Sequence, residues 1–271
     1  TYSDEVVRRL ASMECAAPDF RIFWDNAYAV HHLSDDPSMQ DSLLDIGLAC
    51  KSAGNPHRYL KFASTSKVTF PGAGISGLAA SPENIAEVLR GMGFQTIGHD
   101  KLNQLRHVRF LKDRAALAAH MARHAAIIAP KFDLVCRKLE EGLGAGFGVG
   151  IGVGEGQHAT CTQGTQADPA TRPAPGCLGS WNTPRGGYFI SFDAPEGTAR
   201  RIVALAKEAG VVMTGAGASY PYGKDPLDSN IRIAPTLPPL AELETAMDVF
   251  VCCVKLASVE KLLEERLASQ R

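Results

Sequence analysis

The sequence predicts an α/β fold with a mostly parallel sheet in a large domain, followed by a small α+β domain at the carboxyl end. Short apolar runs alternate with helical patterns over residues 1–110, which favours parallel strands joined by helices. A long helical pattern and a glycine-rich run come next. A second succession of strands and helices then occupies residues 178–271.

The first part of the chain contains three predicted strands. Ser3, which is followed by two acidic residues, is expected to cap an opening helix. Apolar runs at 20–24, 59–63 and 74–80 predict strands. Ser81, which stands before Pro-Glu, predicts the start of another helix.

Two ionisable residues follow predicted strands. Asp25 directly follows the run at 20–24, and Lys67 comes four residues after the run at 59–63. Ligands of parallel α/β sheets bind at the carboxyl ends of the strands. A lysine at the end of a buried strand is costly unless it has a function. Both positions are therefore candidates for a binding site.

The middle of the chain is predicted to be helical and then irregular. Apolar residues recur near helical spacing from 103 to 142, and Pro130 is expected to kink or divide that helix. The helix either links two domains or lies on the surface. Residues 144–177 carry glycine at every even position up to 156 and then a Thr/Gln/Pro/Ala-rich run. This pattern predicts a flexible, low-complexity insertion.

The last block predicts a small domain of short strands and amphipathic helices. Its expected elements are a strand at 187–192, a helix at 198–209, short strands at 211–214 and 230–233, and a final helix from 240 to about 267. Gly210 is expected to end the first of these helices.

Composition argues against several classes of protein. The 271 residues are 45% hydrophobic and 21% charged, with a formal net charge of -1, which argues against disorder and nucleic-acid binding. No apolar run is long enough to span a bilayer, and residues 1–5 lack the features of a signal peptide. The seven cysteines form no CxxC pair. Neither a metal site nor a disulfide framework is therefore favoured, and a cytoplasmic protein with reduced thiols is expected.

Four polar residues form the candidate site: Asp25, Tyr28, Lys67 and Arg232. A lysine amine can form a Schiff base with a cofactor aldehyde and then carry a proton. A carboxylate can keep a pyridine nitrogen protonated, a phenol can bond a ring oxygen, and an arginine can clamp a carboxylate. The combination predicts a site for pyridoxal 5'-phosphate (PLP), although each residue alone is more often a turn former or a solvated charge.

Longer motifs around these residues resemble a known family. The chain contains Asp25-Asn-Ala-Tyr28, then Ser64-Thr-Ser66-Lys67-Val-Thr-Phe-Pro-Gly-Ala-Gly74, and later Asn230-Ile-Arg232-Ile-Ala-Pro235. These motifs resemble the fold-type-one PLP-dependent aminotransferases, in particular a bacterial-type subgroup of aspartate aminotransferases. The resemblance covers nearly the whole chain except about 144–177.

The resemblance implies a role for each motif residue. Lys67 would be the Schiff-base lysine and the proton carrier. The other residues would hold the cofactor or the substrate: Asp25 at the ring nitrogen, Tyr28 at the ring oxygen, Ser64 and Ser66 at the phosphate, and Arg232 at the substrate α-carboxylate. The implied reaction transfers an amino group between an L-amino acid, aspartate or glutamate, and a 2-oxo acid. The implied assembly is a homodimer.

The resemblance also implies a division of the chain. Residues 1–110 would be the remaining part of the PLP-binding large domain, 111–143 a linking helix, 144–177 the insertion and 178–271 the small domain.

Two departures from the family pattern are visible. Many aminotransferases carry a phosphate-binding arginine eight residues after the lysine, and that position is Ile75 here. The family's N-terminal part, with its Asn-Pro-Thr-Gly motif, would fall before Thr1. The chain is therefore expected to be the C-terminal portion of such an enzyme.

Two alternatives to an active aminotransferase stay open. One is a non-catalytic PLP-binding sensor domain of a transcription regulator, which a basic DNA-binding domain elsewhere in the full protein would favour. The other is an inactive truncated fragment of the enzyme. The opening on a helix start and the glycine-rich run favour this second alternative.

Nearby histidines and arginines carry less weight. His31 and His32 have no third metal ligand at suitable spacing, so a structural or surface role is expected for them. The alternative is that one of the two lines the active site. Arg106 and Arg109 would share one helix face beside His107. These residues are either solvated charges or groups placed to bind an anion.

Overall fold

The computed structural model describes residues 2, 4–34, 36, 44–69, 71–144 and 178–270. The chain forms two compact units, Thr1–Ala125 with Arg185–Gly187 and Ala126–Pro184 with Tyr188–Arg271. The predicted insertion at 144–177 lies, apart from residue 144, outside the described residues, and so does Ser3. Among the described residues, no helix is both long and apolar enough to cross a membrane.

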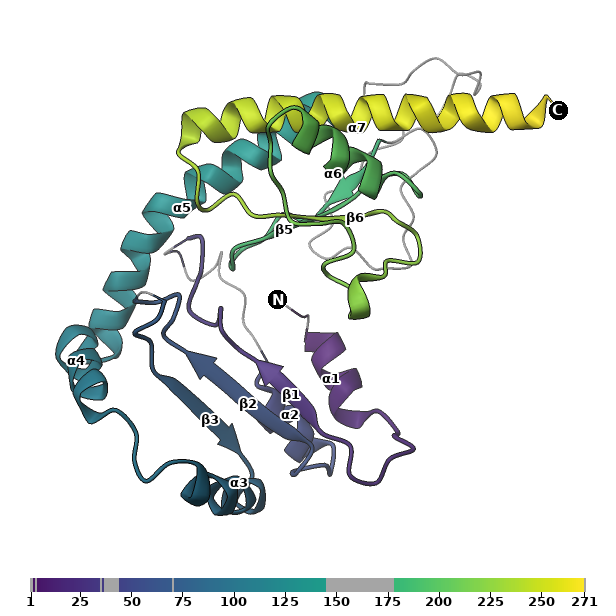
Figure 1. The fold of residues 1–271 in the computed structure, drawn as a ribbon. Helices are drawn as coiled ribbons and strands as arrows, with labels where there is room; N and C mark the ends of the chain where they lie inside the picture. Colours follow the sequence, from purple (N-terminus) through teal and green to yellow (C-terminus); the bar gives the residue numbers. More distant parts are fainter. Residues whose placement is uncertain are drawn as a thin grey trace. The chain divides into compact units, whose positions relative to one another are not determined.

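The first unit contains a three-stranded sheet in the order β1-β2-β3, with helices packed on it (Figure 1). Its elements are α1 (Asp4–Ser12), β1 (Ile22–Asp25), α2 (Ile46–Ser52), β2 (Tyr59–Ser64), β3 (Ser76–Ala80), α3 (Pro82–Gln95), α4 (Lys101–Leu111) and the first part of α5 (Arg114–Leu143). The three strands predicted in this region are therefore present, while α2 was not predicted.

The sheet is mixed, whereas a mostly parallel sheet was predicted. β1 and β2 are parallel, but β3 runs antiparallel to β2, with Ser64 opposite Ser76. The reason is the length of the connection. β1 and β2 are joined by a long segment that contains α2, whereas only residues 65–75 separate β2 from β3. A parallel crossover needs a dozen or more residues and usually a helix.

Helices α1 and α2 bury a small apolar core against the sheet. Its buried members are Val7 and Ala11 of α1 and Ile46, Ala49 and Cys50 of α2. The side chains of Ile22, Trp24, Leu44 and Tyr59 pack around them. The burial of these groups fixes the face of β1 and β2 that lies against the helices.

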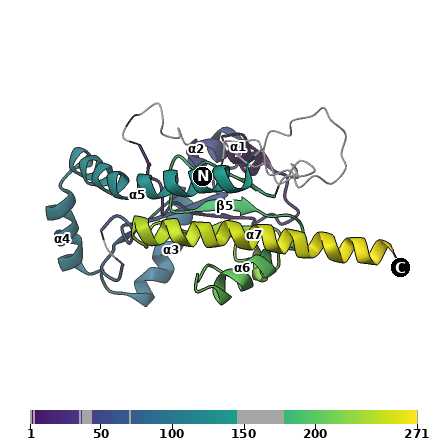
Figure 2. The same cartoon turned by 90° about the horizontal axis from the view of Figure 1, so that it is seen from above.

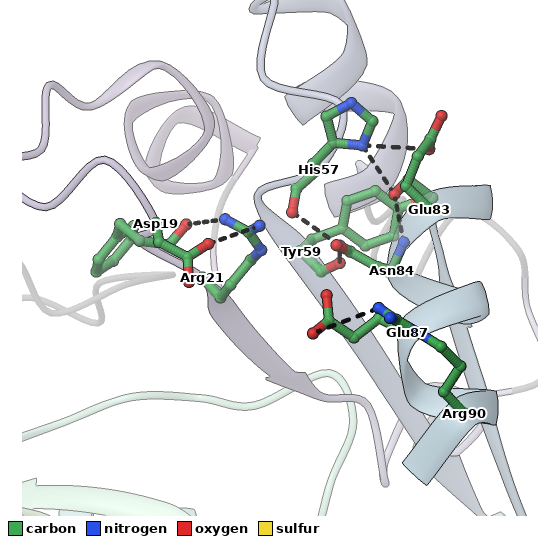
Figure 3. Close-up of polar contacts among 10 residues, drawn as sticks. Asp19, Arg21, His57, Tyr59, Glu83, Asn84, Glu87 and Arg90 are labelled. Carbon is green, nitrogen blue, oxygen red and sulfur yellow. Dashed lines mark hydrogen bonds and ion pairs between the residues drawn. The ribbon is translucent and has the colours of Figure 1, made fainter. Parts of the chain in front are cut away.

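A polar network anchors the start of β2 to the start of α3 (Figure 3). Asn84 donates from its side-chain amide to the carbonyl oxygens of His57 and Tyr59, at 2.8 and 3.3 Å. The Ser81 hydroxyl caps α3 by accepting from the Asn84 amide, and it lies 2.9 Å from Nδ1 of His57. The helix start predicted at Ser81 is thus confirmed. The network fixes the end of β2 that is opposite to Lys67.

The predicted helix at 103–142 is two helices, and the break is not at Pro130. Helix α4 ends before Lys112, whose φ is +54°, and α5 then continues through Pro130. The Asp113 carboxylate accepts from the Ala116 amide at 2.8 Å. A side-chain oxygen at this position supplies one of the bonds that the first turn of a helix lacks.

The second unit has an antiparallel sheet in the order β4-β5-β6 and the last part of α5 (Figure 2). It also has two further helices, α6 and α7, which pack against each other. The elements are β4 (Ser180–Trp181), β5 (Ile190–Asp193), α6 (Ala199–Glu208), a short 3-10 turn (Pro221–Gly223), β6 (Asn230–Ile233) and α7 (Leu240–Ser269). Phe192 of β5 and Phe250 of α7 form an edge-to-face pair at 5.3 Å in its core.

The strand predicted at 211–214 is wrong, because this segment has no ladder partner among the described residues. The Val211 amide donates to the carbonyl oxygen of Ala206, at 2.8 Å, and so closes the end of α6. Val212 is exposed. The neighbouring predictions at 198–209, 230–233 and 240–267 match α6, β6 and α7.

Candidate functional site

Asp25 and the segment leading to Lys67 lie at the same edge of the first sheet. Asp25 is the last residue of β1 and pairs in register with Phe62 of the parallel strand β2. The Asn26 amide extends the ladder by donating to the carbonyl oxygen of Phe62 at 2.8 Å. β2 ends at Ser64, and Lys67 follows in the next turn. The Asp25 side chain is exposed, and its Oδ1 accepts from the Ala27 amide at 3.2 Å.

Lys67 sits in a tight turn that begins at Thr65. The amides of Val68 and Thr69 both donate to the carbonyl oxygen of Thr65, at 3.0 and 2.8 Å. The Thr65 hydroxyl accepts from the Ile75 amide at 2.9 Å, which ties the turn to the segment before β3. These hydrogen bonds fix the backbone of the turn, and so they fix the position of the Lys67 Cα from which the side chain extends.

Ser66 lies against Gly74 in this turn. A Cβ placed on Gly74 would stand 2.8 Å from the Ser66 hydroxyl oxygen and 3.0 Å from the Ser66 amide nitrogen. Only glycine allows such an approach, which brings the backbone of Gly74 beside the hydroxyl predicted to contact a phosphate.

Tyr28 is the aromatic neighbour of Lys67. The Lys67 amine lies 4.9 Å from the centre of the Tyr28 ring. Tyr28 also makes an edge-to-face contact of 5.6 Å with His31. Five of the six predicted site residues therefore belong to one unit: Asp25, Tyr28, Ser64, Ser66 and Lys67.

Three histidines bond the Lys67 turn. His31 Nε2 donates to the carbonyl oxygen of Lys67 at 3.0 Å, and His120 Nε2 donates to that of Val68 at 2.7 Å. His107 Nε2 lies 2.8 Å from the Thr65 hydroxyl. Carbonyl oxygens only accept, so the first two rings must carry a proton on Nε2. These histidines were not assigned to the site from the sequence, because nothing in their spacing indicates a bond to the backbone of a distant turn.

Arg232, the sixth predicted residue, belongs to the second unit. It lies on β6 opposite Ser191, and its guanidinium carbon stands 4.6 Å from the centre of the Phe189 ring. Its Nε is buried and has no hydrogen-bond partner within the described part of the chain. A buried guanidinium nitrogen in this condition is suited to an incoming carboxylate. Among the described residues, no three His, Cys, Asp or Glu side chains are grouped to hold a metal ion.

Comparison with known proteins identifies the family. A sequence model described as "Aspartate amino-transferase" matches residues 1–154 and 170–266. The chain belongs to the aspartate aminotransferase family. An aspartate aminotransferase of Corynebacterium glutamicum is 44% identical over 261 residues, which make up 96% of this chain and 52% of that protein. A protein of Mycolicibacterium smegmatis is 47% identical over 98% of this chain and 54% of its own length.

This aspartate aminotransferase family member thus spans about half the length of the curated relatives it matches. The crystal structure of a Corynebacterium glutamicum aspartate transaminase superposes with a TM-score of 0.80 at 43% identity, over 96% of this chain and 54% of that one. A multiple substrate aminotransferase from Thermococcus profundus reaches a TM-score of 0.68 at 17% identity, which shows the fold alone. The fold is therefore part of an aminotransferase fold.

Proposed function

We propose that the whole protein to which this chain belongs is a PLP-dependent aminotransferase that moves an amino group between aspartate and a 2-oxo acid. The observation that carries the proposal is the placement of Lys67 in a bonded turn, with its amine over Tyr28 and at the same sheet edge as Asp25. The membership in the aspartate aminotransferase family, with a relative of that activity at 44% identity, supports this substrate.

The residues present fit PLP. Lys67 is half-buried and offers the only kind of side chain that can condense with the cofactor aldehyde. Asp25 is exposed, and in the described part of the chain its one hydrogen bond engages Oδ1, which leaves Oδ2 for a protonated ring nitrogen. Ser66 adds a hydroxyl on the turn itself, and Ser64 adds one at the end of β2. Gly74 allows backbone to approach Ser66.

Each residue would have one task. PLP, when bound, supplies an aromatic ring that withdraws electrons from the substrate α-carbon. The Lys67 amine would take the α-proton of the substrate and deliver a proton to the carbon of the cofactor that carries its aldehyde group. The Asp25 carboxylate would hold a proton on the ring nitrogen, and the Tyr28 hydroxyl would bond the ring oxygen. Arg232 would orient the substrate by its α-carboxylate. A homodimer is part of this proposal for the whole protein.

The proposal is tested by amino transfer in the whole protein. Aspartate labelled with heavy nitrogen is mixed with a 2-oxo acid and PLP, and the labelled product amino acid is measured. Lys67→Ala should reduce transfer by on the order of 10³-fold, because the proton carrier is lost. Lys51→Ala removes an exposed lysine of α2 and should leave transfer unchanged. Cofactor bound without any transfer in the wild type would instead support a sensor.

A further inference from the structure

His31 is the most deeply buried polar side chain near Lys67. It is 1% exposed, and its Nε2 donates to the carbonyl oxygen of Lys67 at 3.0 Å. A buried imidazole is costly unless its polar atoms are bonded. Here the bond is to the backbone of the residue that the proposed function needs most, so burial and bonding both serve to hold that residue.

The His31 backbone is itself anchored. Its carbonyl oxygen accepts from the Gly187 amide at 2.8 Å, and its amide donates to the carbonyl oxygen of Tyr28 at 3.1 Å. A Cβ on Gly186 would stand 2.8 Å from the same His31 carbonyl oxygen. The imidazole therefore projects from a fixed backbone and can act as a rigid support.

The His31 side chain contacts both the backbone of Lys67 and the aromatic ring that lies next to the Lys67 amine. The His31 ring packs edge-to-face on Tyr28, and Tyr28 in turn lies beneath the Lys67 amine. One side chain thus contacts the backbone of Lys67 and the ring next to its amine. A shift of the His31 ring would therefore change the position of the Lys67 backbone relative to the Tyr28 ring.

The charge of His31 matters for the same reason. Burial lowers the pKa of His31 most, two backbone hydrogen bonds to Lys67 and Tyr28 oppose this, and the charges of Lys67 and His32 lower it further. Burial and the charge of His120 lower the pKa of His124 on α5, and the charge of His31 lowers it further, so the two histidines are electrostatically coupled. A neutral His31 keeps a second positive charge away from the Lys67 amine.

We propose that His31 is a positioning residue, which holds the backbone of Lys67 through its Nε2–H and so sets where the Lys67 amine stands against Tyr28. The inference rests on the proposed function for its catalytic meaning. The mechanical part, that His31 holds the turn at 65–69, is independent of PLP.

Three variants test it. His31→Leu keeps a similar volume without a donor, His31→Gln offers an amide N–H near the place of Nε2, and His99→Leu alters an exposed histidine as a control. The first readout is amide hydrogen exchange of the peptide that contains residues 65–69, without PLP. The second is the rate at which borohydride traps PLP on Lys67, measured against pH.

In His31→Leu, exchange at 65–69 should accelerate and trapping should slow by about tenfold, the size expected for one buried hydrogen bond. In His31→Gln, the trapping rate should stay within about threefold of the wild-type rate. The decrease of that rate at low pH should become smaller, because glutamine does not titrate as the imidazole does. Wild-type exchange and trapping in His31→Leu would overturn the inference, as would a His31→Gln variant as slow as His31→Leu.

Two further outcomes separate the inference from the proposed function. If wild type is not trapped at all, the proposed function fails and the catalytic meaning of His31 fails with it, while the exchange data still decide whether His31 holds the turn. If His31→Leu exchanges rapidly throughout β2 as well, the variant is unfolded. The decision then rests on His31→Gln, whose loss of trapping would contradict the role of the donor.

Discussion

The imidazole of His31 and the carbonyl oxygen of Lys67 are joined by a hydrogen bond of 3.0 Å across 36 positions of the sequence. His120 and His107, from α5 and α4, bond the same turn at Val68 and Thr65. A hydrogen bond to the backbone of Lys67 helps to fix the position from which the lysine side chain extends. The turn is thus supported by residues from three separate segments.

Replacing Gly74 by alanine should disturb the Lys67 turn. The new Cβ would stand within 3.0 Å of two Ser66 atoms, and overpacking of this kind costs about 1–3 kcal/mol. The free energy of unfolding, measured with urea, should fall by that amount. Gly77→Ala in β3 is the matched control, since nothing lies within 4 Å of its Cβ position. Equal stability of the two variants would contradict the close approach.

Asp45 should stabilise the first unit as the cap of α2. Its Oδ1 accepts from the amides of Gly47 and Leu48 at 2.8 and 3.0 Å, and Oδ2 pairs with Lys61 at 2.5 Å. Asp45→Ala should lower the free energy of unfolding by about 0.5–2 kcal/mol. Asp45→Asn keeps a capping oxygen and should lose less. An equal loss in both variants would assign the effect to the ion pair.

The pH dependence of Asp45 has a definite sign. Burial alone would raise its pKa, but the hydrogen bond from Lys61 and those from the Leu48 and Gly47 amides outweigh burial and lower it. The stabilisation is therefore present above the ordinary carboxyl pKa of 3.8 and is lost as pH falls through the lowered value.

Acidification should weaken the fold already below pH 6.5. Burial lowers the pKa of both His31 and His124 from 6.5, so the unfolded chain binds more protons between 6.5 and the lowered values. The free energy of unfolding then decreases as pH falls, by up to about 1.4 kcal/mol per pH unit for the buried His31. The contribution of His124 is smaller, because solvent screens its charge. Urea unfolding at several pH values measures the slope. A double variant, His31→Gln with His124→Gln, should flatten it, and an unchanged slope would refute the assignment.

Arg232→Lys should weaken substrate binding in the whole protein. Lysine cannot present two parallel N–H groups to a carboxylate and cannot stack on Phe189 in the same way. The KM for aspartate should rise by about 10–100-fold, the equivalent of one charge-assisted hydrogen bond, with a smaller change in kcat. Arg200→Lys alters an arginine whose side chain is 77% exposed and should leave KM unchanged. An unaltered KM in Arg232→Lys would remove this residue from the site.

Much of the fold was predictable because local signals agree with it. Ser81 and Pro82 mark the start of α3, and the apolar pattern at 230–233 matches β6. Helix α2 was missed because its seven residues are too few for a periodic pattern. The strand at 211–214 was wrong because its apolar residues close the end of α6. The antiparallel direction of β3 was missed because it follows from the short connection at 65–75, and not from the apolar pattern of the strand.

For the candidate site, the residue types indicated Lys67, Asp25 and Tyr28 and also their common edge of the sheet. The supporting histidines were not predictable, because His31, His107 and His120 reach the turn from positions 36 to 52 residues away in the chain. A bond from a side chain to a distant backbone leaves no pattern in the sequence. Only the folded chain reveals it.

The most direct test of the account is to locate the lysine that PLP modifies. The protein is incubated with PLP, reduced with borohydride, digested, and mapped by mass spectrometry. If Lys67 binds the cofactor, one dominant adduct forms on Lys67, which is absent in Lys67→Ala and retained in Lys51→Ala. Adducts spread over exposed lysines, or a pattern that Lys67→Ala does not change, would contradict the assignment of Lys67 as the cofactor-binding residue.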